Sequence, residues 1–358
     1  MGLGGLNTIS LAQAREAARD CRALTHSGID PIERRREQAA KTILDAAKAI
    51  TFDECAERYI NAHEAGWRNE KHAAQWRATL KTYASPLIGS LPVQMIDVGL
   101  VMNILEPIWY EKTETASRVR GRIESVLDWA TTRGYRSGDN PARWRGHLEN
   151  LLPRRSKVQS VTHYAAVPYQ EIGDFMQDLA AQEGVAKDAL AFLILTGTRT
   201  SETIGATWDE VDLSKNLWVI PAVRIKAGKE HRVPLSPPAM KILRHLSKAR
   251  TGEFIFPGAK ADKPLSNMAL LALLKRMRRF GLTVHGFRST FRDWAAEQTN
   301  FPREVAEMAL AHAVGDKVEA AYRRGDLFKK RQQLMDEWGR YCGRQGAEKT
   351  RRKKAGAQ

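Results

Sequence analysis

Apolar residues recur at helical spacing along most of the chain. Residues 10–25 place leucine and alanine three or four positions apart behind Ser10, a residue type that caps helix N-termini. After the turn GIDP, residues 33–50 resume a helical pattern that is rich in charge. This stretch is too short and too polar to form a hydrophobic core of its own, so we interpret residues 1–50 as a helical arm or connector.

Residues 51–150 carry four stronger helical patterns, separated by glycine or proline, which predict a compact all-α domain. Its predicted core residues are Trp76, Leu80, Leu87, Leu105, Trp109, Val126, Leu127 and Trp129. The last of the four helices also carries Arg118, Arg120, Arg122 and Arg133. These arginines form either a solvated face or a face turned toward nucleic acid.

The pattern changes after residues 151–163, a polar and basic segment that we interpret as a linker. Residues 164–345 contain helical patterns around a stretch of short alternating segments, 211–236, which predicts a small antiparallel meander. The fold class is therefore mainly α with a small antiparallel sheet (α+β). Residues 346–358 have the composition of a basic disordered tail.

Charge distinguishes this chain from an ordinary globular protein. Its 358 residues include 57 Lys and Arg against 41 Asp and Glu, a net charge of +16 that attracts polyanions such as nucleic acid. The three cysteines are far apart and suggest neither a disulfide framework nor a zinc site. Neither a signal peptide nor a membrane span is indicated, so we expect a cytoplasmic protein with DNA as partner and no membrane.

Four stretches of residues 164–345 combine basic or nucleophilic residues with a helix or turn. They hold Arg199 and Glu202, Lys226 and Lys229, His285 and Arg288, and finally His312 and Tyr322. Taken singly, each has an ordinary structural explanation: an ion pair three positions apart, a solvated lysine, a satisfied core histidine, a core aromatic residue.

Together these side chains have the composition needed for phosphoryl transfer without a metal. Arginines can neutralise the charge that develops on the nonbridging oxygens, and nearby cations help a tyrosine hydroxyl to ionise and attack. No DxD, HExxH or GxxxxGK[ST] motif suggests a metal or nucleotide, so we expect neither metal nor cofactor.

In their order along the chain, the motifs TGTRTSE, KAGKEHRVPLS, HGFRSTFRDWAAE, LAH and AAYRR resemble those of the tyrosine recombinases, or phage integrase family. The sequences of these motifs are most similar to those of integrases of prophages and genomic islands, and the resemblance runs from about Ser10 to about Tyr341. It implies a site-specific recombinase that integrates or excises such an element without ATP or metal.

The resemblance also implies a role for each candidate residue. Arg199 and Arg288 would clamp the scissile phosphate, and His285 and His312 would donate further hydrogen bonds to it. Lys226 would protonate the leaving 5′ oxygen, with Lys229 as the alternative. Tyr322 would attack phosphorus and form a 3′-phosphotyrosyl bond, and Glu202 would support Arg199.

The implied architecture is a C-shaped DNA clamp of a helical core-binding domain, 51–150, and a catalytic domain, 164–345. Four protomers would act on two duplexes, with a possible accessory DNA-bending protein and excisionase, in association with the nucleoid. Residues 1–50 would be the helical remnant of an arm-binding region, with most of that module lacking. Residues 327–342 would either pass between protomers or fold back on their own domain.

Two other functions are compatible with the same residues. A type IB topoisomerase uses phosphotyrosine chemistry to relax DNA without exchanging partners, but the helical domain ahead of residue 164 and the integrase-like motifs favour recombination. A non-catalytic DNA-binding protein on a recombinase fold would have lost a catalytic residue. None is missing from the set of Arg199, Lys226, His285, Arg288, His312 and Tyr322.

Overall fold

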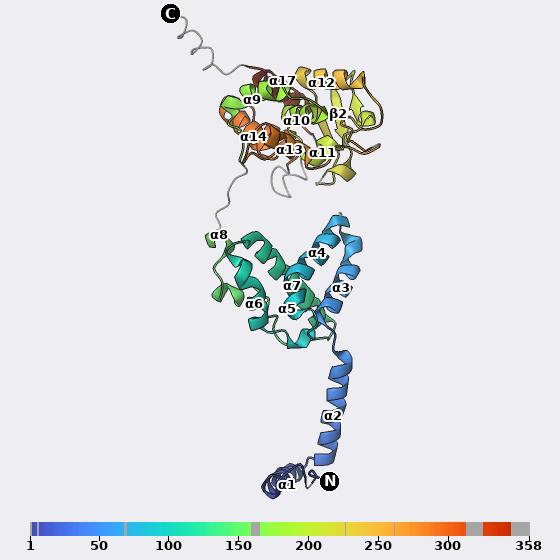
Figure 1. Cartoon of the computed structure of the whole chain (residues 1–358), viewed down its shortest axis with the longest axis vertical. Helices are drawn as coiled ribbons and strands as arrows, with labels where there is room; N and C mark the ends of the chain where they lie inside the picture. The colour runs from blue at the N-terminus through green and yellow to red at the C-terminus, as the bar shows by residue number, and fades with distance from the viewer. Residues whose placement is uncertain are drawn as a thin grey trace, which may run out of the picture. The chain divides into compact units, whose positions relative to one another are not determined.

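The computed structural model describes residues 2–5, 7–67, 70–158, 165–225, 227–260, 262–312 and 325–344. The chain divides into two compact units, residues 1–161 and 162–358, and each is described by itself (Figure 1). Both are mainly helical, and the described strands all belong to one small sheet in the second unit. Within the described part of the chain, every helix is too short or too polar to span a bilayer.

The first unit begins with two helices, α1 (Leu11–His26) and α2 (Pro31–Lys48). Ser10 caps α1 as predicted: its hydroxyl accepts a hydrogen bond from the backbone N–H of Gln13, and the Gln13 side chain accepts one from the backbone of Ser10. No residue of α1 is buried. Its helical form therefore rests on local propensity and capping and not on a core.

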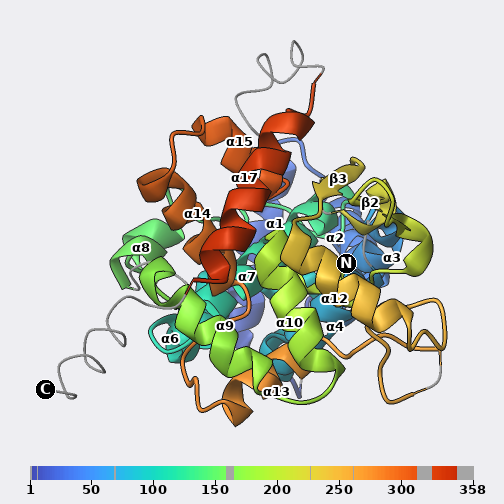
Figure 2. The same cartoon turned by 90° about the horizontal axis from the view of Figure 1, so that it is seen from above.

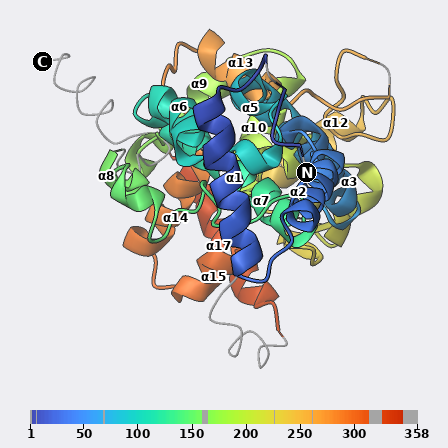
Figure 3. The ribbon, with the colours of Figure 1, turned by 90° about the horizontal axis from the view of Figure 1, so that it is seen from below.

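The four helical patterns of residues 51–150 fold as predicted, except that the second divides in two. The elements are α3 (Phe52–His63), η1 (Glu64–Gly66), α4 (Glu70–Tyr83), α5 (Ser85–Ile88), η2 (Val93–Met95), α6 (Val98–Trp109), α7 (Thr113–Thr132), η3 (Leu148–Asn150) and α8 (Arg155–Val158). Helix α7 packs against α3, α4 and α6, and Figure 3 shows the ribbon of this unit from below. The division between α4 and α5 coincides with Pro86, which cannot continue a helix from the preceding turn.

The core of this unit contains most of the predicted residues. Buried are Trp76, Leu80, Leu105, Trp109, Val126 and Leu127, and Trp129 is partly buried against them. The prediction of Leu87 as a core residue is wrong, because its side chain is 48% exposed. Helix α5 is a single turn in which Ile88 is the buried residue, so Leu87 lies on the outer side.

The arginines of α7 are mostly engaged within the protein. Arg120 donates to the carboxylate of Glu124 at 2.6 Å, and Arg122, which is 8% exposed, donates to the backbone oxygen of Gln75 at 2.7 Å. Arg118 is exposed and forms an ion pair with Glu114 one turn earlier. Arg120 and Arg122 therefore stabilise the unit itself, and neither a solvated nor a DNA-facing role describes them.

The second unit places helices around the small sheet. Its elements are η4 (Tyr169–Glu171), α9 (Ile172–Ala180), α10 (Val185–Thr196), α11 (Thr200–Ile204), η5 (Trp208–Glu210), β1 (Val211–Asp212), β2 (Leu217–Ile220), η6 (Ala222–Arg224), β3 (His231–Pro234), α12 (Pro237–Ser247), α13 (Ala269–Arg276), α14 (Gly286–Gln298), α15 (Arg303–Ala309) and α17 (Phe328–Cys342). The strands form an antiparallel sheet of order β1-β2-β3, in which Trp218 pairs with Val233 and Ile220 with His231. The predicted meander is confirmed.

Helix α10 lies at the centre of this unit and contacts α9, α11, α12, α13, α14 and α17. Helix α17 folds back on its own unit, crossing α9 and α10 in Figure 2. Trp338 of α17 is fully buried and donates from Nε1 to the backbone oxygen of Ile194 in α10 at 2.8 Å. Of the two arrangements considered for residues 327–342, the structure has the one in which the helix folds back on its own domain.

Candidate functional site

The TGTRTSE motif forms a sharp turn between α10 and α11. Gly197 ends α10 with φ +65°, the left-handed conformation that favours glycine, and Arg199 is the N-cap of α11. Glu202 is 2% exposed and accepts from both the backbone N–H of Arg199 at 2.8 Å and its Nη1 at 2.7 Å. The predicted support of Arg199 by Glu202 is therefore a pair of hydrogen bonds that fixes both the backbone and the guanidinium.

The HGFR motif begins α14, with His285 at its N-cap and Arg288 in the first turn. Arg288 is 3% exposed. Its Nη1 donates to the backbone oxygen of Gly197, and its Nη2 donates to that of Leu310 at 2.7 Å and lies 2.9 Å from Nε2 of His312. Within the described residues, the buried Nε of Arg288 has no hydrogen-bond partner. Arg288 thus links the C-terminal ends of α10 and α15 through its two terminal nitrogens, and its Nε–H is a further hydrogen-bond donor.

The LAH motif follows the end of α15 in a Schellman turn. The N–H of His312 donates to the backbone oxygen of Glu307 at 2.9 Å, and that of Ala311 donates to Met308 at 3.1 Å. Ala311 has φ +51°, a left-handed conformation that is strained for any residue but glycine. This turn reverses the chain so that the side chains of Glu307 and His312, five residues apart, meet.

The described candidate residues Arg199, His285, Arg288 and His312 lie close enough to affect one another electrostatically, and the two arginines carry the positive charge. Burial, and then the charge of Arg199, lowers the pKa of Arg288 to about 10. Burial also lowers the pKa of His285, and the charges of Arg288, Arg199 and His312 lower it further. Such mutual repulsion favours the binding of an anion, because a bound negative charge would relieve it.

Sequence reasoning missed Glu307 and Arg292. Oε2 of Glu307 lies 2.7 Å from Nδ1 of His312, and its Oε1 accepts from Nε of Arg292 at 2.7 Å. Although burial alone would raise it, these hydrogen bonds from His312 and Arg292 lower the pKa of Glu307. The signal that could have found Glu307 is the LAH turn itself, since a Schellman motif brings the C3 and C″ side chains into contact.

His231 of β3 is a second residue that the sequence did not reveal. It is 8% exposed and hydrogen-bonds to the backbone of Ala309, close to the carboxylate of Glu202. Burial, and then the charge of Arg331, lowers its pKa to about 4. His231 is therefore neutral at physiological pH and links the sheet to the end of α15.

Lys226 and Tyr322 lie outside the described residues, so the structure leaves their predicted roles open. The chain just before Lys226 is fastened to the site. Arg224 donates from Nη1 to the carboxylate of Glu210 and from Nη2 to the backbone oxygen of Glu202. Lys229, the alternative acid, is exposed between β2 and β3.

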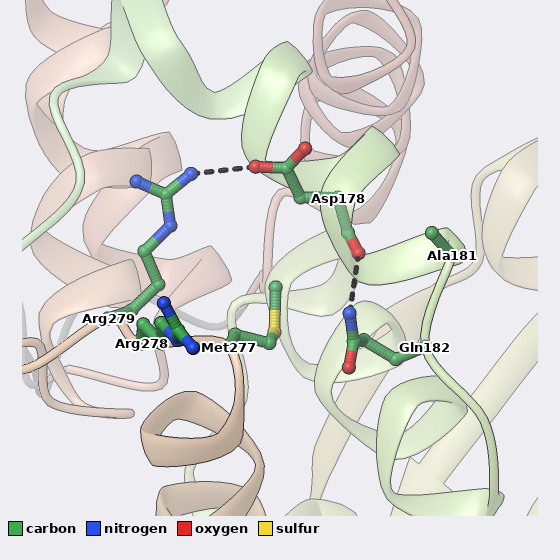
Figure 4. Close-up of a pocket in the computed structure, with 6 residues that line it drawn as sticks. All are labelled: Asp178, Ala181, Gln182, Met277, Arg278 and Arg279. Atoms are coloured by element: carbon green, nitrogen blue, oxygen red, sulfur yellow. Dashed lines mark hydrogen bonds and ion pairs between the residues drawn. The ribbon is translucent and has the colours of Figure 1, made fainter.

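The described residues contain no group of His, Cys, Asp and Glu that could hold a metal ion. The second unit has a cavity of about 410 Å³ between α9 and the end of α13, lined by Asp178, Ala181, Gln182, Met277, Arg278 and Arg279. Figure 4 shows that Arg279 reaches across it to Asp178, an ion pair of 2.7 Å. None of the candidate residues lines this cavity, so nothing connects it with the candidate site.

Family models match most of the chain. Residues 52–147 match the phage integrase central domain, residues 167–326 match the phage integrase family, and residues 1–38 match an arm DNA-binding domain. The last match assigns residues 1–38 to an arm DNA-binding domain, so the expectation that most of this module is lacking is not supported.

Curated proteins with similar sequences carry the same description. Prophage integrase IntZ of Escherichia coli (strain K12) is 30% identical over 339 residues, which are 94% of this chain and 81% of that protein. Prophage integrase IntA of the same strain is 29% identical over 341 residues, 94% of this chain and 80% of that protein.

A solved structure of a lambda integrase tetramer bound to a Holliday junction shares the fold. Its TM-score is 0.61 at 16% identity, and the match covers 85% of this chain and 90% of that one. The predicted fold class, a helical domain followed by a mainly helical domain with a small sheet, is thereby confirmed.

Proposed function

The chain belongs to the phage integrase family and is a tyrosine-type site-specific recombinase, and we propose that it cuts and rejoins DNA through a covalent bond between Tyr322 and a 3′ phosphate. The observation that carries the proposal is the cluster of Arg199, His285, Arg288 and His312 around one small volume. We propose that the scissile phosphodiester of an attachment site binds in this cluster, where its negative charge relieves the repulsion between the arginines.

The two arginines share one task in the proposed reaction. Arg199, held by Glu202, and Arg288, held by Gly197 and Leu310, neutralise the charge on the nonbridging oxygens. Their anchors are made before DNA binds, so little reorganisation is needed at the moment of reaction.

The proposed step exchanges one phosphodiester for another. The Tyr322 hydroxyl loses its proton to solvent and its oxygen forms a bond to phosphorus, the bond from phosphorus to the 5′ oxygen breaks, and Lys226 gives that oxygen a proton. Because the phosphotyrosyl bond keeps the energy of the broken bond, the 5′ hydroxyl of a second strand can reverse the step without ATP. The position of Arg224, bound to α11 two residues before Lys226, supports this role for the lysine.

We also propose the larger assembly. Residues 51–150 and 164–345, joined by the linker 151–163, would form the two halves of a C-shaped clamp on duplex DNA, with residues 346–358 as a basic tail. Residues 1–50 would bind arm sites, a role supported by the family match over 1–38. Four protomers would join two duplexes, as in the lambda integrase tetramer, with a DNA-bending protein and an excisionase as accessory partners. The protein would act on the nucleoid in the cytoplasm.

A nicked suicide substrate tests the covalent step. The substrate carries the attachment sequence, read from the ends of the host element, with a nick that releases the short 5′ fragment after cleavage. We expect wild-type protein to shift to a higher mass on a denaturing gel and Tyr322→Phe not to shift. The matched control is Tyr110→Phe, because Tyr110 is 65% exposed in the first unit, and it should shift like wild type.

Two results would overturn the proposal. A wild-type protein that never becomes attached to its own site would exclude the phosphotyrosyl mechanism, as would a Tyr322→Phe protein that shifts equally. Efficient relaxation of supercoiled DNA without an attachment site would instead favour a type IB topoisomerase.

A further inference from the structure

The environment of His312 determines which of its ring nitrogens carries a proton. Oε2 of Glu307 lies 2.7 Å from Nδ1, and Nη2 of Arg288 lies 2.9 Å from Nε2. An ionised carboxylate can only accept a hydrogen bond, and a guanidinium can only donate one. Both neighbours therefore require the same state: Nδ1 is protonated, and Nε2 is an acceptor.

Glu307 is itself held in place. Its other oxygen, Oε1, accepts from Arg292 at 2.7 Å, and the Schellman turn joins the backbone of Glu307 to that of His312 at 2.9 Å. The side chain of Glu307 is 17% exposed, whereas that of His312 is 41% exposed. The carboxylate thus lies behind the ring, and the ring's outer edge is open to a ligand.

This arrangement conflicts with hydrogen-bond donation by His312 to a phosphate. An unprotonated Nε2 presents a lone pair, which repels a phosphate oxygen. If a phosphate takes over the N–H of Arg288, Nε2 loses its donor as well. His312 can then contact the phosphate favourably only by taking up one proton from solvent.

Titratable groups from three helices lie around His312. Arg288 and Glu307 contact its ring, and His285 is close enough to interact with it electrostatically. Arg292 and Arg303 pair with Glu307, and Arg199 pairs with Glu202. Buried His231 of β3 is neutral and adds no charge. Of the two carboxylates, Glu307 is the one bound to the ring.

We propose that Glu307 is a positioning residue that lets His312 change from hydrogen-bond acceptor to donor when DNA binds. In the free protein it holds the ring with one proton on Nδ1. In the complex it stabilises the second proton, on Nε2, which donates to a nonbridging oxygen of the diester. One proton is taken up from solvent per occupied site. The DNA-linked half of this inference rests on the proposed function, and the free-protein half does not.

Histidine side-chain NMR tests the free protein. Wild-type protein labelled with ¹⁵N-histidine is compared with His312→Gln, and the signal that disappears belongs to His312. We expect the wild-type signal to report a proton on Nδ1 and none on Nε2. A ring protonated on Nε2 alone would overturn the inference without any variant of Glu307.

Calorimetry tests the complex. Tyr322→Phe protein, which cannot become covalently attached, is titrated with its core-site duplex in two buffers of different ionisation enthalpy. We expect Glu307→Gln to abolish the uptake of about one proton per bound protomer. The matched control, Glu304→Gln on the same helix, should leave the uptake unchanged.

A second background separates this effect from a general loss of negative charge. On a His312→Gln background, Glu307→Gln should change the proton uptake no further, because the group that receives the proton is gone. An equal loss on both backgrounds, or no loss in Glu307→Gln, would overturn the inference. A duplex that fails to bind at all would overturn the proposed function instead, while the NMR result would still decide the free-protein half.

The rate of covalent attachment adds a functional readout. In the protein with Tyr322 intact, Glu307→Gln should slow single-turnover cleavage about 10- to 100-fold, the range for losing a hydrogen bond to a charged group. Glu304→Gln should cleave at the wild-type rate. A Glu307→Gln protein that cleaves as fast as wild type would contradict the proposed role of Glu307 in positioning His312.

Discussion

Arg331 and Asp326 are joined by two hydrogen bonds inside the second unit. Nη2 of Arg331 donates to the Asp326 carboxylate at 2.6 Å, and Nε donates to the Asp326 backbone oxygen at 2.7 Å. Its Nη1 donates to the backbone oxygen of Arg232 in β3 at 2.5 Å. Arg331 is 1% exposed, so this one side chain fastens the stretch four residues after Tyr322 to the sheet.

Replacing Arg331 should destabilise the second unit more than any exposed arginine does. We expect Arg331→Ala to lower the free energy of unfolding by about 2–4 kcal/mol, because it leaves buried carbonyl oxygens without donors. Arg331→Lys should recover only part of the loss, since one ammonium cannot reach three acceptors in the geometry of a planar fork. Urea denaturation measures both.

The matched control lies on the same helix. Arg340 is exposed, and Arg340→Ala should change the free energy of unfolding by no more than about 0.5 kcal/mol. If Arg331→Ala were as mild as Arg340→Ala, the contacts of Arg331 would have no structural importance.

The left-handed conformation of Ala311 predicts an unusual response to substitution. With φ +51°, its Cβ is strained, and glycine would remove a strain of about 1–2 kcal/mol at the expense of a more flexible unfolded chain. We expect Ala311→Gly to be neutral or stabilising by up to about 1 kcal/mol. Ala311→Val should destabilise by about 1–3 kcal/mol, because a β-branched residue tolerates this conformation worst.

Thermal unfolding and cleavage of the suicide substrate, measured together, check this prediction. Ala311→Val should also slow covalent attachment, since the turn that joins Glu307 to His312 would be disturbed. An Ala311→Gly protein that unfolds at a much lower temperature than wild type would contradict the assigned conformation.

Buried His231 predicts how stability depends on pH. Its pKa in the folded protein is about 4, below the value of 6.5 for an exposed histidine, so between these values the unfolded chain binds more protons than the folded one. The free energy of unfolding should therefore fall as the pH is lowered from 6.5 toward 4, by at most roughly 3 kcal/mol from this residue. Above pH 6.5 its contribution is complete.

Urea denaturation at a series of pH values, with His231→Gln as comparison, measures that slope. The variant should lose stability less steeply between pH 6.5 and 4. The control His245→Gln, at an exposed position of α12, should keep the wild-type slope. Equal slopes in His231→Gln and wild type would show that His231 is not the group responsible.

Patterns confined to one helix or hairpin could be predicted from the sequence. Apolar spacing located the helices of both units and the alternating segments of the sheet, and the three-residue spacing of Arg199 and Glu202 predicted their pairing. Leu87 failed because one short helix offers a single inward position, which Ile88 occupies.

Contacts made by turns and by distant segments could not be predicted. The five-residue spacing of Glu307 and His312 fits no helical face, and only the left-handed Ala311 explains why they meet. His231 gave no signal, because the groups around it, among them Ala309 of α15 and Arg331 of α17, lie far along the chain. The roles of Lys226 and Tyr322 stay predictions, since both lie outside the described residues.

The choice between Lys226 and Lys229 as general acid can be tested by changing the leaving group. A substrate with sulfur in place of the bridging 5′ oxygen releases a thiolate, which leaves without protonation because a thiol is far more acidic than an alcohol. We expect Lys226→Ala to slow attachment to the ordinary substrate about 100-fold or more, and to react with the sulfur substrate at the wild-type rate. Lys229→Ala, at an exposed position of the same connection, should cleave both substrates normally. If Lys229→Ala were slow on the ordinary substrate and only this variant regained the wild-type rate on the sulfur substrate, Lys229 would be the acid. A Lys226→Ala protein that stayed slow on the sulfur substrate would show that the substitution displaces another group of the site.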